Sequence, residues 1–154
     1  MLQGIKTQIY PTVKQKIYLD DLLGSYRFVF NKCLEYKIGQ FTNHNKNVGL
    51  KELGNFVHQN LRKSKDFTWL TKHNSKVLFQ ATLDLLDAYK NFFVNESGFP
   101  NFKSKKDKQS CRFPVDAIAK KTFNGSRVNL TKQIKNLKFK CSKQNLQSLH
   151  NVKI

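Results

Sequence analysis

The spacing of apolar residues changes at Gly98, and this change constrains the fold more than any other feature of the sequence. Residues 12–97 carry apolar side chains at the three- and four-residue spacing of amphipathic helices. After Gly98 the helical spacing stops and short alternating stretches follow, as they also do at residues 4–10. The pattern predicts an α+β fold in which the first strand pairs with the late ones and a helical segment is inserted between them.

About four helices are expected in the inserted segment. Thr12 and Gln15 have capping-box spacing, so the first helix should start near Val13, and Gly24 should break or bend it. The others are expected at about 25–40, at about 50–62 and from residue 75, with a polar loop at 41–47. Trp69 should attach the connector at 64–70 to the helical core. The apolar stripes predict a core that includes Val13, Ile17, Leu22 or Leu23, Tyr26, Val29, Phe30, Cys33, Lys37, Leu50, Leu53, Val57, Leu61, Leu78, Ala81, Leu85, Ala88 or Tyr89, and Phe92.

Three later stretches, at 126–130, 134–142 and 150–154, are predicted to be strands. Within the second of them, apolar and basic residues alternate. The apolar set is Ile134, Leu137, Phe139 and Cys141, and the basic set is Lys138 and Lys140. Because alternate side chains of a strand point to opposite faces, we expect one buried and one basic face on the same sheet.

The net charge and its distribution along the sequence indicate which class of partner the protein binds. The formal net charge is +18, and residues 98–154 account for +12 of it. A surface that is basic only for solubility would mix signs, and an anionic membrane would normally be met by one basic helix or a polybasic tail. Since the charge is spread through loop-like and strand-like sequence, nucleic acid is the preferred partner.

The same sequence gives expectations about location. It has no apolar run long enough to span a membrane and no apolar leader near Met1. Its three cysteines, Cys33, Cys111 and Cys141, are far apart and form no CxxC pair. We therefore expect a cytoplasmic protein with reduced thiols and no membrane partner.

The most concentrated charge lies in GFPNFKSKKDKQSCRFP, residues 98–114, which we call the basic loop. Gly98 should end the fourth helix, and Pro100 should prevent its continuation. Phe99 and Phe102 should attach the loop to the fold, although an exposed ring could instead stack on a base. The cations would then meet a phosphate backbone: Lys103, Lys105, Lys106, Lys108 and Arg112. A merely solvated loop remains the alternative.

Residues for catalysis are missing. A two-metal nuclease needs clustered carboxylates, and the basic final third offers only Asp107 and Asp116. The four histidines (His44, His58, His73 and His150) lack ligand spacing, so each is expected to be an ordinary surface or loop residue. We expect no cofactor, no metal site and no small-molecule substrate. Lys76 and Gln80 project together from the fourth helix, either as an ordinary solvated face or as a contact surface.

Four segments resemble a known family in order and spacing: IYPTVKQ, SYRFVFNKCLEYK, SKVLFQATLDLLDAYKNFF and the basic loop. They are similar to the N-terminal half of the insertion-sequence OrfB proteins, the TnpB-type transposases that act as RNA-guided nucleases. The resemblance covers nearly the whole chain, and the basic loop is its most specific part.

The resemblance implies a small wedge-type, oligonucleotide-binding-like β-barrel interrupted by a helical recognition domain, often described as helix-turn-helix. Residues 1–11 would be the first barrel strand, 12–97 the recognition domain, and 98–154 the basic loop with the remaining strands. The partners implied are structured guide RNA and target-adjacent DNA. Lys76 and Gln80 match the family positions that contact the adjacent motif, and the cations after the GFPNF turn would contact the nucleic-acid backbone.

The sequence departs from the family where catalysis would begin. Family members continue into a RuvC-like nuclease domain with an acidic triad and a zinc-ribbon element, and neither is present in these 154 residues. We therefore expect a truncated, non-cleaving nucleic-acid-binding chain with an incomplete barrel. Two alternatives are a regulator of the transposon and one half of a split nuclease whose catalytic domain is encoded separately.

Overall fold

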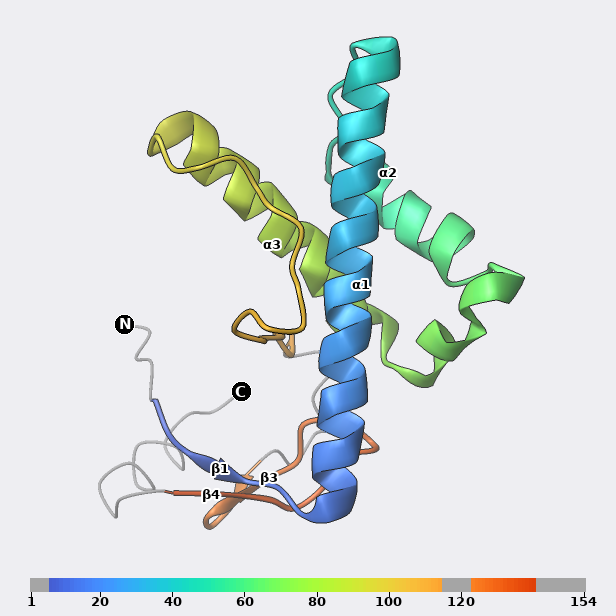
Figure 1. Ribbon diagram of the computed structural model, residues 1–154. Coiled ribbons are helices and arrows are strands. Elements are labelled where there is room, and N and C mark those ends of the chain that lie inside the picture. The colour runs from blue at the N-terminus through green and yellow to red at the C-terminus, as the bar shows by residue number, and fades with distance from the viewer. Residues whose placement is uncertain (1–5, 115–122, 141–154) are drawn as a thin grey trace. The chain divides into compact units, whose positions relative to one another are not determined.

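The computed structural model describes residues 6–114 and 123–140 (Figure 1). The expectations for Ile5, Asp116, Cys141 and the strand at 150–154, with His150, lie outside these residues. The chain divides into two compact units. The helical unit comprises residues 20–114, and the sheet unit comprises residues 1–19 and 115–154. The predicted α+β class is confirmed.

The strands form one small antiparallel sheet in the order β1-β4-β3-β2. Its members are β1 (Ile9–Tyr10), β2 (Phe123–Asn124), β3 (Arg127–Val128) and β4 (Leu137–Phe139). Ile9 lies opposite Phe139, so the predicted pairing of the first strand with a late one is confirmed. The sequence analysis missed β2, which joins β3 through a two-residue turn with Gly125 at φ +57°. The turn dipeptide Gly125-Ser126 is a known hairpin signal that could have revealed it.

The faces of β4 alternate as predicted. Leu137 and Phe139 are buried, whereas Lys138 and Lys140 are exposed. Val128 and Ile134 complete the buried side, and the ring of Phe123 lies edge-on to Phe139 at 6.1 Å between centroids. A strand with one buried face has a fixed register, so the lysines are held on the opposite face.

Helix α1 (Val13–His44) starts as predicted, with a reciprocal capping box. The backbone N–H of Gln15 donates to Thr12 Oγ1, and that of Thr12 donates to Gln15 Oε1. The expected break at Gly24 was wrong, because α1 continues through it to His44 and absorbs part of the predicted 41–47 loop. One glycine costs a helix only about 1 kcal/mol, which tertiary packing readily outweighs. Val13 and Ile17, expected in the core, are 78% and 65% exposed.

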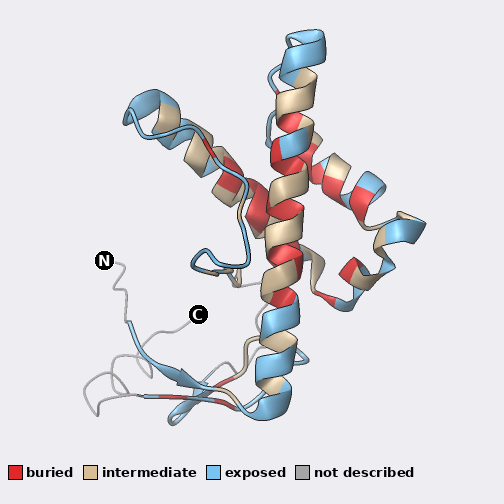
Figure 2. Ribbon diagram, viewed as in Figure 1, coloured by how far each residue is buried: buried red, intermediate tan, exposed pale blue. Residues whose placement is uncertain are grey.

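The core of the helical unit lies where α1 meets two further helical segments (Figure 2). These are α2 (Leu50–Asn55), which continues as the π-helical η1 (Phe56–Leu61), and α3 (Ser75–Val94). Gly54 allows a close approach, because a Cβ there would lie 2.9 Å from the ring of Phe79 on α3. The predicted stripes are largely confirmed: Leu22, Tyr26, Val29, Phe30, Cys33, Lys37, Leu53, Val57, Leu61, Leu78, Ala81 and Leu85 are buried. Leu50 is 40% exposed and Phe92 half-buried.

The connector between η1 and α3 forms a short 3₁₀ segment, η2 (Lys65–Lys72). Trp69 attaches it to α1 as predicted, since its ring contacts Phe28 edge-on at 4.9 Å between centroids. Phe67 contacts the same Phe28 ring at 4.9 Å. Two aromatic contacts, together with the fully buried Leu70, therefore fix this segment to the helical core.

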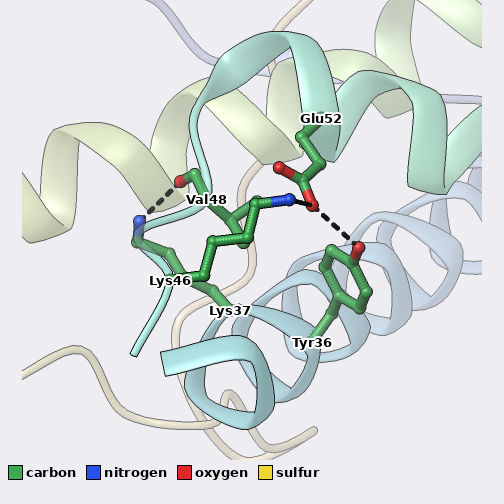
Figure 3. A network of polar contacts seen from close by, with 5 residues as sticks. All are labelled: Tyr36, Lys37, Lys46, Val48 and Glu52. Atoms are coloured by element: carbon green, nitrogen blue, oxygen red, sulfur yellow. Dashed lines mark hydrogen bonds and ion pairs between the residues drawn. The ribbon is translucent and has the colours of Figure 1, made fainter. Parts of the chain in front are cut away.

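The connection between α1 and α2, residues 45–49, is held by a buried lysine, Lys37, and by an exposed one, Lys46 (Figure 3). Lys37 Nζ donates to the carbonyl of Val48 and to Asn47 Oδ1, each at 2.6 Å. Glu52 Oε1 accepts from Lys46 Nζ at 2.9 Å and from the Tyr36 hydroxyl at 3.0 Å. Burial lowers the pKa of Lys37, while the hydrogen bond from Lys46 lowers the pKa of Glu52.

Candidate nucleic-acid interface

α3, the helix that precedes the basic loop, ends earlier than the sequence analysis predicted. The helix stops at Val94 and not near Gly98, and Glu96 takes the left-handed conformation at φ 50°. Phe99 then packs edge-on against Tyr89 and Phe92, with 5.4 Å between ring centroids in each case. Pro100 is buried beside it. This aromatic cluster fixes the first residues of the loop to α3, as expected of Phe99.

The middle of the loop is attached to α1 by one side-chain amide. Asn31 Oδ1 accepts from the backbone N–H of Lys103 at 2.8 Å, and Asn31 Nδ2 donates to the Lys103 carbonyl at 2.9 Å. The Lys103 ammonium lies over the ring of Phe30, 4.1 Å from its centroid. A backbone held at both its donor and its acceptor has little freedom left, so Asn31 fixes the course of the loop.

The tip of the loop is a tight turn that presents three lysines to solvent. The Ser104 backbone N–H donates to Asp107 Oδ2 at 2.6 Å, and the Asp107 N–H donates to the Ser104 carbonyl at 3.3 Å. Asp107, weighed above only as a catalytic acid, therefore closes the turn. Lys105, Lys106 and Lys108 are exposed around it.

The far side of the loop is held by contacts with both helices. Gln109 Nε2 donates to the carbonyls of Ser104 and Asp107, while its Oε1 accepts from Arg27 on α1 at 2.7 Å. Arg112 Nε lies 2.9 Å from Asp84 on α3, and its Nη2 lies 3.7 Å from Asp87.

Asp84, which the sequence analysis did not single out, has a side chain that is only 14% exposed. Besides its ion pair with Arg112, it accepts from the Tyr26 hydroxyl at 2.5 Å. Burial, followed by this hydrogen bond, raises the pKa of Tyr26. Burial also raises the pKa of the neighbouring Cys111 thiol to about 11, so that thiol is neutral at pH 7.

Two candidate residues lie on the first turns of α3, in the same helical unit as the basic loop. Asn74 caps the helix through its Oδ1, which accepts from the Lys76 N–H at 2.9 Å. The Lys76 side chain is exposed, and Gln80 is half-buried one turn later. Both side chains are thus accessible from solvent, as either interpretation of the pair requires.

The last two candidates, Lys138 and Lys140, lie on or beside β4 in the sheet unit. Lys138 is directly opposite Tyr10 on one side and Arg127 on the other. The sequence analysis named neither neighbour, and only strand register could have revealed them. Two cations directly opposite each other are destabilising, whereas an anion bound between them would remove that penalty. Lys140 fixes its strand through its backbone, with its N–H donating to the Gln8 carbonyl at 2.8 Å.

One of the four histidines, His73, was wrongly expected to be an ordinary surface or loop residue. It is buried, with Nε2 3.4 Å from Asp21 Oδ2, and burial lowers its pKa.

The residues that the structure describes contain no group of three or more His, Cys, Asp or Glu side chains that could hold a metal ion. Among the same residues, no helix combines the length and apolar character that crossing a bilayer requires.

The sequence matches one protein-family model and several known proteins. The family model HTH_OrfB_IS605, described as a helix-turn-helix domain, matches residues 1–46. In the described part of that stretch, residues 6–46, the structure has β1 and the single continuous helix α1.

Two longer relatives match most of this chain. It is 30% identical over 113 residues to the putative RNA-guided DNA endonuclease InsQ of Escherichia coli K12. It is 27% identical over 142 residues to a putative RNA-guided DNA endonuclease of Streptomyces pristinaespiralis. The matches cover 73% and 92% of this chain but only 28% and 34% of those relatives.

A third relative is much shorter. The virulence protein VsdF of Salmonella dublin is 32% identical over 119 residues, which cover 70% of this chain and 98% of VsdF. The family model, the two endonucleases and the motif order all agree with the resemblance noted in the sequence. The chain belongs to the OrfB (TnpB-type) family of IS605-like insertion-sequence proteins.

Proposed function

We propose that this chain binds nucleic acid through the basic loop, with Lys105, Lys106 and Lys108 contacting the phosphate backbone. The observation that carries the proposal is the turn at Ser104–Asp107: its backbone is hydrogen-bonded within the protein while three ammonium groups around it are exposed. Because the turn is ordered before binding, little conformational entropy is lost when a phosphate backbone docks on it. Phosphate contacts of this kind supply affinity and little sequence preference.

The other candidate cations have different parts in this proposal. Lys103 lies over Phe30 and Arg112 pairs with two carboxylates, so we expect smaller contributions from both. Lys138 and Lys140 form a second basic surface on the sheet, where Arg127 and Tyr10 join them. Lys76 and Gln80 contact the base pairs of a target-adjacent motif from the start of α3.

The nucleic acids proposed are structured guide RNA and target-adjacent duplex DNA, and the sheet is proposed to be part of a wedge-type, oligonucleotide-binding-like barrel. Membership of the OrfB family and similarity to two proteins named as RNA-guided DNA endonucleases support this assignment. We assign binding and not cleavage to these 154 residues. Incubation with Mg²⁺ and duplex DNA should therefore leave the DNA intact, and cutting at a defined distance from a motif would overturn that assignment.

The first experiment is the salt dependence of binding. A fluorescently labelled RNA hairpin is titrated with the whole chain at several KCl concentrations, and the dissociation constant is taken from anisotropy. Three lysine–phosphate contacts should give the logarithm of the association constant a slope of about −2 to −3 against the logarithm of salt concentration, and contacts by further cations should make it steeper. Binding that ignores salt, or the absence of binding to both RNA and DNA, would contradict the proposal.

A further inference from the structure

A hollow of about 890 Å³ lies between the basic loop and the side of α1, inside the helical unit. Its volume is in the range of pockets that enclose small organic groups. Phe28 and Trp69 line one part of it, and Phe102 and Lys105 contribute from the loop. Gly24 also lines it and leaves it open, since a Cβ there would meet only Arg27 Nη2, at 4.0 Å.

The aromatic rings of the hollow are accessible. Phe102 is 55% exposed, and Phe28 and Trp69 are half-buried against each other. Phe99 differs from Phe102, because its contacts with Tyr89 and Phe92 account for its role in fixing the loop. An exposed ring beside a cavity is the usual platform on which an unpaired base stacks.

Both signs of charge line the α1 side of the hollow: Asp20, Asp21 and Glu35 supply carboxylates, and Arg27 and Lys32 supply cations. Both of these cations already have protein partners, because Arg27 donates to Gln109 and Lys32 pairs with Glu35 at 2.8 Å. Lys105, which comes from the loop, is exposed. A phosphate therefore fits best at the loop, which leaves the base towards α1, where carboxylates accept hydrogen bonds from base N–H groups.

The walls are fixed before any ligand arrives. Asn31 and Gln109 both line the hollow, and both use their amides to hold the basic loop. Arg27, which also lines the hollow, donates a hydrogen bond to Gln109 Oε1. The hollow therefore does not depend on an ordering step that binding would have to supply.

We propose that this hollow is a pocket for one unpaired nucleobase of a single-stranded nucleic acid, stacked against Phe102 and the Phe28–Trp69 pair. The proposal rests on the proposed function and adds to it a requirement for an unpaired base. The lysines at the tip of the loop then bind the adjoining phosphates, and the strand leaves its duplex or loop at this point.

The single tryptophan of the chain makes the proposal testable. A short single-stranded RNA of mixed sequence and a fully paired RNA duplex are each titrated into the whole chain, with Trp69 fluorescence and labelled-RNA anisotropy followed in parallel. Stacking nearby should quench Trp69 saturably with the single strand, at the concentrations where anisotropy rises. The duplex should bind with little quenching.

Two matched variants separate stacking from folding. Phe102→Ala should weaken single-strand binding roughly tenfold and leave duplex binding unchanged. Phe93→Ala removes an even more exposed ring, 74% exposed, outside the hollow, and should change neither. Binding by anisotropy without Trp69 quenching, or equal quenching by the duplex, would overturn the pocket and leave the proposed function standing. Loss of all RNA and DNA binding by the unmodified chain would overturn both.

Discussion

Two irregular segments of the helical unit are both rich in lysine contacts, yet they use lysine in opposite ways. At the α1–α2 connection, the buried Lys37 donates to the Val48 carbonyl and to Asn47, while the exposed Lys46 pairs with Glu52. In the basic loop the amides of Asn31 and Gln109, together with the Asp107 carboxylate, hold the backbone, and Lys105, Lys106 and Lys108 remain exposed. What distinguishes them is which group satisfies the backbone.

The largest effect is expected from replacing Lys37, the buried lysine that holds the α1–α2 connection. Lys37→Met keeps the apolar stem but leaves the Val48 carbonyl and Asn47 Oδ1 without their donor. Leaving such groups unsatisfied should lower the free energy of unfolding by about 2 kcal/mol, measured by urea denaturation, without weakening RNA binding by the folded protein. Lys46→Met, in the exposed part of the same network, should cost less. Unchanged stability in Lys37→Met would show that this lysine does not hold the connection.

Asn31→Ala tests the opposite arrangement, because it removes the attachment of the basic loop without changing its charge. The loss of two hydrogen bonds to Lys103 should cost about 1–2 kcal/mol of stability. It should also weaken RNA binding roughly fivefold, since the loop must then be ordered on binding. Asn60→Ala, at an exposed position on η1, is the matched control. Full RNA affinity in Asn31→Ala would mean that the charge of the loop is sufficient without its conformation.

The smallest expected effect is a difference in acid sensitivity. The pKa of Glu52 is lowered in the folded protein, so the stability it contributes is present above its usual value of 4.5 and is lost as pH falls through the folded value. The stability difference between the unmodified chain and Glu52→Gln should therefore be present at pH 7 and vanish in strong acid. The Asn31–Lys103 attachment contains no titrating group, so the difference between the unmodified chain and Asn31→Ala should not follow this curve. If the stability losses of Glu52→Gln and Asn31→Ala varied with pH in the same way, the two segments would not differ in acid sensitivity.

The sequence was sufficient to predict several features of the fold, although the local hairpin of β2 and β3 was missed. The capping box at Thr12, the alternation at Lys138, the burial of Lys37 and the pairing of the first strand with a late one were all predictable. The break expected at Gly24 was wrong because propensity is a small term beside the packing of a helix of 32 residues.

The remaining features of the site depend on partners that are distant in the sequence. The role of Asn31 requires Lys103, which is 72 residues away, and Arg112 meets Asp84 from another element. The burial of His73 likewise depends on how η2 and α1 pack, and no periodicity in the sequence encodes it. The sequence could therefore identify the basic loop as a candidate, but not which of its cations are already paired.

The most direct measurement compares two triple variants of equal charge. Lys105→Ala, Lys106→Ala and Lys108→Ala remove the lysines at the tip of the loop, and Lys51→Ala, Lys65→Ala and Lys90→Ala remove three exposed lysines elsewhere in the helical unit. We predict that the loop variant loses about 10- to 100-fold in RNA affinity, with a salt slope flatter by about 2–3, while the control variant keeps most of both. Equal losses in the two variants would mean that total charge, and not the basic loop, binds the nucleic acid.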